Sequence, residues 1–176
     1  FSQKYPNIKF ILEDLSNKDQ LIALERLLLD VGFIRSDHVP ETMMIRSVNK
    51  ENFCLVLPEN HSVSAENFQG MQQLANESFI LFPNERSNKY FQLIVNMCEE
   101  SGFTPKITHR AIDGPTIFKL VESELGISVV PSSLRDEKNY KIKFIELRDQ
   151  PQKTELFAVW NKQNENPALR FFLELV

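Results

Sequence analysis

The chain has 176 residues, of which 42% are hydrophobic, and this is enough to bury a core in one domain or in two small ones. Lysine and arginine total 20 against 24 aspartate and glutamate, which gives a formal net charge of −4. Because phosphate neutralisation needs a basic face, this balance argues against a chain that grips nucleic acid by itself. No apolar run approaches the length of a membrane span.

The two cysteines, Cys54 and Cys98, form neither a disulfide framework nor a metal-binding spacing. We interpret them as inert, buried thiols in a reducing compartment, and we expect a cytoplasmic protein. The chain starts in what reads as the end of a helix, so we expect further residues upstream of Phe1.

The first part of the chain reads as strand, helix, strand. The apolar run 8–12 has the length of a strand, and Ser16 with Asp19 three residues later is typical of a capped helix start. The buried face of this helix is expected to consist of Leu21, Leu24 and Leu28. The next strand is expected at 31–34, with a right-handed crossover between the two strands.

A second cycle of strand and helix follows a polar region. Two pieces of strand are expected within 46–57, separated by the polar residues 49–52. A strand at 79–82, a helix at 88–100 and a strand at 107–111 come next. The buried stripe of that helix is expected to be Phe91, Ile94, Val95 and Cys98.

Residues 113–134 combine a helix and a buried strand. Pro115 suits the first turn of a helix, where its missing N–H costs nothing. The apolar stripe of this helix consists of Ile117, Leu120, Val121 and Leu125. Gly126 is expected as the left-handed residue that ends the helix, and 127–130 as a strand ended by Pro131. A helix that leads into a buried strand is half of a parallel βαβ unit.

The remaining residues complete the pattern. Strands are expected at 141–147 and 156–160, and a terminal helix at 167–176. Strand and helix thus alternate twice, which predicts an α/β fold with parallel sheets.

A search for catalytic chemistry finds no strong candidate. There is no G-x-S-x-G elbow, no G-x-G-x-x-G and no Walker loop, and the chain has only 5 glycines. The histidines lack the spacing of metal ligands; they are His38, His61 and His109. Glu13 and Asp14 are adjacent carboxylates at the end of a predicted strand, where solvation is the usual role. The sequence therefore predicts no catalytic residue, no metal and no cofactor.

A binding site is easier to predict. In open α/β sheets, ligands bind outside the carboxyl ends of the strands, where helix N-termini present N–H groups and a partial positive charge. Four such places lie at 15–17, 34–36, 83–88 and 112–116. Their hydroxyl and guanidinium groups belong to Ser16, Ser36, Ser87, Thr116, Arg35 and Arg86. This set suits a small anion, most simply a carboxylate. The simpler alternatives stay open: Ser16 as an N-cap alone, and both arginines as exposed side chains.

Three motifs resemble signatures of LysR-type transcriptional regulators. They are Leu-Asp-Val-Gly-Phe-Ile-Arg at 29–35, Phe-Cys-Leu-Val-Leu-Pro-Glu-Asn-His at 53–61 and Leu-Val-Glu-Ser-Glu-Leu-Gly-Ile-Ser-Val-Val-Pro-Ser-Ser-Leu at 120–134. All three occur in the order and at the spacing of that family, so the resemblance covers essentially the whole chain.

The resemblance implies a fold like that of type 2 periplasmic binding proteins. Two Rossmann-like subdomains would be joined by two crossing segments, with the second subdomain inserted into the first. The first subdomain would comprise residues 1–57 and 147–176, and the second residues 58–146. The N-terminal DNA-binding domain of the family is not in this chain.

The resemblance also implies a function: binding of a small metabolite, the effector, in the cleft between the subdomains. The positions that would line this site are Ser16, Asn17, Arg35, Pro83, Arg86, Ser87, Gly114 and Thr116. Family members commonly add a loop after a first strand that this chain lacks. The partners implied are a homodimer or homotetramer, and promoter DNA through the absent domain, with no membrane.

Two alternatives share the two-lobed plan. A periplasmic solute-binding protein would predict a signal peptide and docking to a transporter. An enzyme on the same scaffold would need acid–base residues facing the cleft, for which Asp113 and Glu13 are the available candidates.

Overall fold

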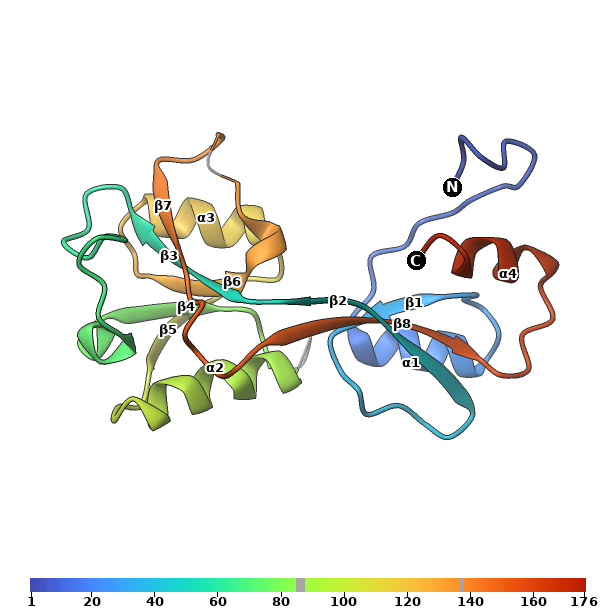
Figure 1. The fold of residues 1–176 in the computed structure, drawn as a ribbon, viewed down its shortest axis with the longest axis horizontal. Coiled ribbons are helices and arrows are strands. Elements are labelled where there is room, and N and C mark those ends of the chain that lie inside the picture. The colour runs from blue at the N-terminus through green and yellow to red at the C-terminus, as the bar shows by residue number, and fades with distance from the viewer. Residues whose placement is uncertain (85–87, 137) are drawn as a thin grey trace. The chain divides into compact units, whose positions relative to one another are not determined.

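The computed structural model describes residues 1–84, 88–136 and 138–176. These residues belong to two compact units, the first made of 1–49 and 155–176 and the second of 50–154. Figure 1 labels the helices and strands of both units.

The compact units and the predicted subdomains differ at residues 50–57 and 147–154, which the sequence analysis places in the first subdomain. Strand pairing explains the difference. Most of residues 50–57 lie in the strand β3, Phe53–Pro58, which pairs with two strands of the second unit. Compact units follow contacts alone, so the predicted subdomain boundaries remain a prediction.

The first unit contains a three-stranded sheet in the order β1-β8-β2. Its strands are β1 (Gly32–Ile34), β2 (Met43–Glu51) and β8 (Thr154–Asn161), and β1 runs antiparallel to β8. The sequence predicts a parallel strand-helix-strand unit here, and that prediction is wrong. The partner of β1 comes from the C-terminal part of the chain instead of from the apolar run before the first helix.

The helix α1, Asn17–Glu25, begins where the sequence predicts, with Ser16 as its N-cap. Leu24 is fully buried against β1, but Leu28 is 76% exposed. The expectation that Leu28 belongs to the buried face is wrong because the helix ends early: Leu27 has a φ of 56°, in the left-handed region. The other helix of this unit is α4, Pro167–Leu173.

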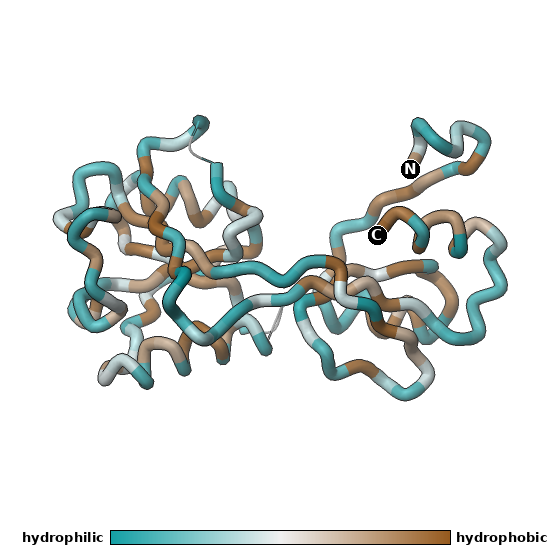
Figure 2. Tube along the Cα trace, in the orientation of Figure 1, coloured by the Kyte–Doolittle hydropathy of each residue, from teal (hydrophilic) through white to brown (hydrophobic). Residues whose placement is uncertain are grey.

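The predicted strand at 8–12 does not form. This hydrophobic segment, seen in Figure 2, has no ladder partner among the described residues, and Leu12 is 82% exposed. Aromatic packing against α4 holds this N-terminal segment in place instead. The ring centroids of Phe1 and Phe10 lie 5.4 and 5.6 Å from that of Phe172, on α4. Apolar composition alone therefore did not determine a strand, because a strand needs a partner for its backbone hydrogen bonds.

The second unit is built around β3. This strand is antiparallel to both β6 (Ser128–Pro131) and β7 (Ile142–Glu146). The strands β4 (Ser78–Leu81) and β5 (Lys106–Arg110) are parallel to each other. A parallel bridge between Phe79 and Ile127 joins β4 to the residue that precedes β6. The parallel arrangement predicted for the second cycle is therefore present in these three strands.

Alternate residues of β3 point into two cores, one on each face of the sheet. Phe53, Leu55 and Leu57 pack in the core that includes α2, Asn88–Glu100. Cys54 and Val56 pack in the core that includes α3, Gly114–Glu122. A strand buried on both faces explains its unbroken apolar sequence. The second unit thus has a layer of sheet between two layers of helix (Figure 1).

The buried faces of α2 and α3 differ slightly from the predicted ones. In α2 the fully covered residues are Tyr90, Ile94, Met97 and Cys98, whereas Phe91 and Val95 are half-buried. In α3 they are Ile117, Phe118 and Val121, and the predicted Leu125 is exposed. Two short 3₁₀ helices complete the unit: η1, Met71–Leu74, and η2, Ser132–Leu134. In the described part of the chain, no helix is long and apolar enough to cross a membrane.

Gly126 has a different role from the predicted one. Helix α3 ends at Glu122, and the left-handed residue after it is Glu124, with a φ of 59°. Gly126 has a φ of 153°, and a Cβ there would lie 2.5 Å from the carbonyl oxygen of Ser78. Glycine is required because this backbone passes so close to β4, where the amide of Ile127 donates to that same carbonyl at 2.8 Å.

Candidate ligand-binding site

The carboxyl ends of several strands meet at one edge of the second unit. Strands β4, β5 and β6 are parallel, and β7 runs in the same direction as β6 because both are antiparallel to β3. Pro83 follows β4, the start of α3 follows β5, and η2 follows β6. This edge therefore collects the predicted residues Pro83, Gly114 and Thr116, as expected for the binding edge of an α/β sheet.

Asp113 begins α3 as its N-cap. Its Oδ1 accepts from the amide of Thr116 at 2.8 Å, and its Oδ2 accepts from the hydroxyl of the same residue at 3.0 Å. Pro115 lies in the first turn, as predicted. Gly114 is buried beside η2: a Cβ on it would lie 3.8 Å from Leu134. The start of α3 is thus packed against the segment that follows β6.

A buried carboxylate that the sequence did not reveal lies at the same edge. Glu51 ends β2, is 8% exposed, and accepts from the hydroxyls of Ser132 and Ser133, both at 3.0 Å. It also accepts from the amide of Ser133 at 2.5 Å. The sequence predicts a break at 49–52, but β2 continues to Glu51. Only the fold could reveal this group, because its partners come from a distant part of the sequence.

Asn52, the residue after Glu51, belongs to a second polar group, which also contains Glu146 and Arg148. The Asn52 side chain donates to Oε1 of Glu146 at 2.6 Å, and Nε of Arg148 donates to its Oε2 at 3.0 Å. These hydrogen bonds, first that of Asn52 and then that of Arg148, lower the pKa of Glu146 from its ordinary value. This carboxylate is therefore held ionised at the end of β7.

In the first unit, the predicted residues lie where α1 begins and β1 ends. The Ser16 hydroxyl accepts from the amide of Asp19 at 3.1 Å, and it donates to the carboxylate of the same residue at 2.6 Å. Gln20 joins helix to strand, since its side chain accepts from the amide of Phe33 at 2.7 Å. Asn17 is the first residue of the helix, and Arg35 directly follows β1 and is half-buried.

The predicted site residues that the structure describes lie at strand ends and helix starts of their own unit: Ser16, Asn17 and Arg35 in the first, and Pro83, Gly114 and Thr116 in the second. Their role in binding a ligand remains a prediction. Arg86 and Ser87 lie outside the described residues. The hydroxyl of Ser16 caps α1, as one of the two predicted roles requires.

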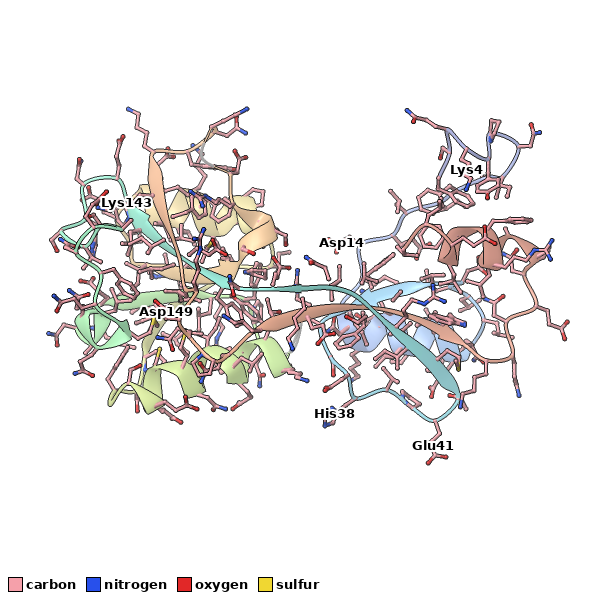
Figure 3. The ribbon with its side chains drawn as sticks, in the orientation of Figure 1. Lys4, Asp14, His38, Glu41, Lys143 and Asp149 are labelled. Atoms are coloured by element: carbon pink, nitrogen blue, oxygen red, sulfur yellow. The ribbon has the colours of Figure 1, made fainter. Side chains whose placement is uncertain are left out.

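The histidines lie on three different segments: His38 in the loop after β1, His61 in the loop after β3, and His109 in β5. His38 lies in an exposed loop beside Asp37, and Figure 3 labels it there. His61 lines a cavity of about 220 Å³ with Glu77, to which its Nε2 lies at 3.3 Å. Lys143, also labelled in Figure 3, donates to the carbonyl of His61. Among the described residues, no group of three or more histidine, cysteine or acidic side chains could hold a metal ion.

The cysteines are buried, as predicted. Burial, with a smaller contribution from Glu99, raises the pKa of the Cys98 thiol to about 12. A thiol with so high a pKa forms little thiolate at neutral pH and is a poor nucleophile.

Comparison with known proteins identifies the family. Residues 1–176 match the family model of the LysR substrate binding domain, so the chain belongs to that family. It is 24% identical over 173 residues to an uncharacterized HTH-type transcriptional regulator, YnfL of Escherichia coli (strain K12), covering 98% of this chain and 58% of the relative. It is 22% identical over 175 residues to the regulator AlsR of Bacillus subtilis (strain 168), covering 99% of this chain and 58% of the relative. The chain thus spans less than two thirds of the length of these regulators.

Solved structures show the same fold. Full-length CbnR in complex with its target DNA gives a TM-score of 0.85 at 19% identity, covering 98% of this chain and 61% of that one. The effector binding domain of BenM with its effector benzoate gives a TM-score of 0.80 at 20% identity, covering 99% of this chain and 82% of that one. The effector binding domain of QuiR in complex with shikimate gives a TM-score of 0.81 at 20% identity, covering 98% of this chain and 81% of that one. The α/β fold of this chain is that of LysR effector-binding domains.

Proposed function

We propose that this chain is the effector-sensing domain of a LysR-type transcriptional regulator and that its effector is a small anionic metabolite. The match of all 176 residues to the LysR substrate binding domain carries this proposal. The structural neighbours BenM and QuiR support it, because their structures hold benzoate and shikimate, which are both small carboxylates. Matches to transcriptional regulators also favour this function over that of a transporter's solute-binding protein.

We propose that the effector is bound by residues at the strand ends described above. In the first unit they are Ser16, Asn17 and Arg35; in the second they are Pro83, Arg86, Ser87, Gly114 and Thr116. A guanidinium group forms charge-assisted hydrogen bonds with a carboxylate, which makes Arg35 the strongest described candidate for holding the anion. The start of α1 adds the partial positive charge of a helix N-terminus.

The whole regulator would have further parts. DNA binding would belong to an N-terminal domain outside this chain, which agrees with the net charge of −4. We propose a homodimer or homotetramer that acts in the cytoplasm without catalysis, with two subdomains, 1–57 with 147–176 and 58–146. An effector can change such an assembly only by binding one of its arrangements more tightly than another.

A thermal-shift screen with small carboxylates and amino acids would test this proposal. A binder raises the melting temperature by mass action, and the rise should be lost in Arg35→Ala. Arg26→Ala is the matched control, since it removes an exposed arginine of the same unit at the C-cap of α1. If both variants respond like the natural chain, Arg35 does not hold the effector. If no small anion binds, the proposed effector class is wrong.

A further inference from the structure

A cavity of about 220 Å³ lies in the second unit, at the edge of the sheet where β4 and β6 begin. It is lined by the end of β3 and the loop after it, by the residue before β4, and by the segment that leads into β6. The candidate ligand-binding site lies where β4 and β6 end, which is the opposite edge. All lining residues of the cavity belong to the second unit, so its walls come from one compact unit.

The imidazole of His61 is a wall of this cavity, and its side chain is 13% exposed. Its Nδ1 lies 3.1 Å from the amide nitrogen of Val63. A backbone amide can only donate, so Nδ1 accepts and carries no hydrogen. The ring hydrogen is therefore on Nε2, which lies 3.3 Å from Oε1 of Glu77. In this form the ring is neutral, and its one N–H is directed at Glu77.

The main chain around the cavity has already used most of its hydrogen-bond donors. Pro58, at the end of β3, has no amide hydrogen. Four other lining residues give their amide hydrogens to main-chain carbonyls: His61, Glu77, Glu124 and Ile127 donate to Pro58, Leu74, Val121 and Ser78, respectively. Among the lining residues, this leaves Asn60 and Gly126 as donors. A ligand anion would therefore find few hydrogen bonds here.

Hydrogen-bond acceptors, in contrast, are plentiful in the cavity. Glu77 and Glu124 both line it, and an ionised carboxylate can accept about four hydrogen bonds. His61 uses one of these positions on Glu77. Lys143 brings one positive charge, since its Nζ donates to the main-chain carbonyl of His61. Two carboxylates against one ammonium leave a negative balance, which suits a ligand that is positively charged and donates hydrogen bonds.

We propose that this cavity binds a small amine in its ammonium form, with the carboxylates of Glu77 and Glu124 accepting its hydrogen bonds. Pro58 and Ile127 supply apolar surface for the alkyl part of the amine. A metal ion does not fit, because the described part of the chain holds no group of three or more histidine, cysteine or acidic side chains that could bind one. This site is independent of the proposed function, since it shares no residue with the candidate effector site.

Titration of the isotope-labelled chain with butylammonium at pH 8, followed by nuclear magnetic resonance, tests the proposal. An alkylammonium stays charged at this pH, and butanol is the control ligand with the same alkyl chain and no charge. So small a ligand should bind with a Kd of about 1–10 mM and should shift the amide resonances of Gly126 and Ile127 saturably. Butanol should bind at least tenfold more weakly. Shifts that do not saturate below about 100 mM, or equal binding of butanol, overturn the proposal and leave the proposed function intact.

Removal of single charges separates contact in the cavity from the overall charge of the chain. Glu77→Gln and Glu124→Gln each remove one carboxylate of the cavity, and each should weaken butylammonium binding at least threefold. Glu59→Gln is the matched control and should change the Kd by less than twofold, because this exposed carboxylate adjoins Pro58 in the sequence but does not line the cavity. Glu124→Gln, at an exposed residue, decides the question if Glu77→Gln does not fold. Equal effects of the cavity and control variants would show a response to net charge alone and would overturn the site.

A lysine side chain of a partner protein would present the same butylammonium group as a free amine. Nα-acetyl-lysine methylamide carries this group on a peptide backbone, and it should bind no more tightly than butylammonium. Tighter binding of the peptide form would assign the cavity to a partner's lysine and would overturn the free amine as its occupant.

The imidazole of His61 supplies a test without ligand. Nitrogen resonances of the ring at pH 8 show which atom carries the hydrogen, and it should be Nε2. A hydrogen on Nδ1 would mean that the ring does not accept from Val63 and does not direct its N–H at Glu77. The balance of donors and acceptors in the cavity would then differ from the one described, and the proposal would be wrong.

Discussion

The first unit of this chain has the larger share of hydrophobic residues, 34 of 71 against 40 of 105 in the second, yet it buries them less thoroughly. In the second unit, β3 is buried on both faces, and each face has its own core and its own helix. In the first unit, β1 is three residues long, and the fully buried residues of its core are Leu24, Ile34, Met43 and Val159. Apolar residues such as Ile11 and Leu12 stay exposed there. Burial on two faces, rather than hydrophobicity as such, distinguishes the second unit.

The comparison predicts that a leucine-to-alanine substitution lowers the free energy of unfolding by different amounts in the two units. Leu55→Ala, in the middle of β3, should lower the free energy of unfolding by about 2–5 kcal/mol, because a fully buried side chain leaves a cavity. Leu28→Ala, at a residue that is 76% exposed, should change it by less than about 0.5 kcal/mol. Urea unfolding followed by circular dichroism measures both. Comparable losses would mean that Leu28 is covered in solution.

The close approach at Gly126 predicts the next largest effect. Gly126→Ala would place a Cβ 2.5 Å from the carbonyl oxygen of Ser78 and should cost about 2–3 kcal/mol. Gly70→Ala is the matched control, because Gly70 also has a positive φ, 139°, but no atom within 4 Å of the added Cβ. That variant should cost about 1 kcal/mol from backbone strain alone. Equal unfolding midpoints for the two variants would show that the contact with β4 is not tight.

Removal of a helix cap in the first unit should cause a smaller loss of stability. Ser16→Ala removes the N-cap of α1 and should lower stability by about 1 kcal/mol. Ser36→Ala should cost less than about 0.5 kcal/mol, because that hydroxyl accepts only a loop amide, from His38 at 3.2 Å. Urea unfolding monitored at Trp160, which lies in β8 of this unit, measures the difference. No difference between the variants would argue that the hydrogen bond from the amide of Phe33 to the side chain of Gln20, and not the cap, fixes the start of α1.

Local sequence signals predicted the elements that local interactions determine. Ser16 caps α1 and Pro115 lies in the first turn of α3, both as predicted, and the apolar runs around Leu55 and Val129 are buried strands. The errors arise where a distant partner decides the outcome. The run 8–12 has no pairing strand in the part of the chain that the structure describes, and β1 pairs with β8, which comes from the other end of the chain. No local pattern could supply those partners.

The candidate site also has groups that local sequence signals could predict and groups that depend on distant parts of the chain. Its hydroxyls and helix starts were predictable, because capping residues follow the ends of strands. Glu51 was not, because its role depends on Ser132 and Ser133, and only the pairing of β3 with β6 brings those segments together. Nor could residue types alone show that the hydroxyls at the site donate to neighbouring carboxylates. The direction of a hydrogen bond is a property of the folded chain.

The last prediction concerns pH and the second unit. The pKa of Glu146 lies below its ordinary value of 4.5, chiefly because Asn52 and then Arg148 donate to the ionised carboxylate. A carboxyl whose pKa is lowered on folding stabilises the fold above its unfolded pKa, and that stabilisation is lost as pH falls through the folded pKa. Glu146→Gln should therefore be less stable than the natural chain at pH 7, and the difference should shrink as pH falls through the folded pKa of Glu146. Glu59→Gln removes an exposed negative charge from the same unit and is the control. If the gap between Glu146→Gln and the natural chain persists at acid pH, the hydrogen bonds of Asn52 matter through geometry and not through charge.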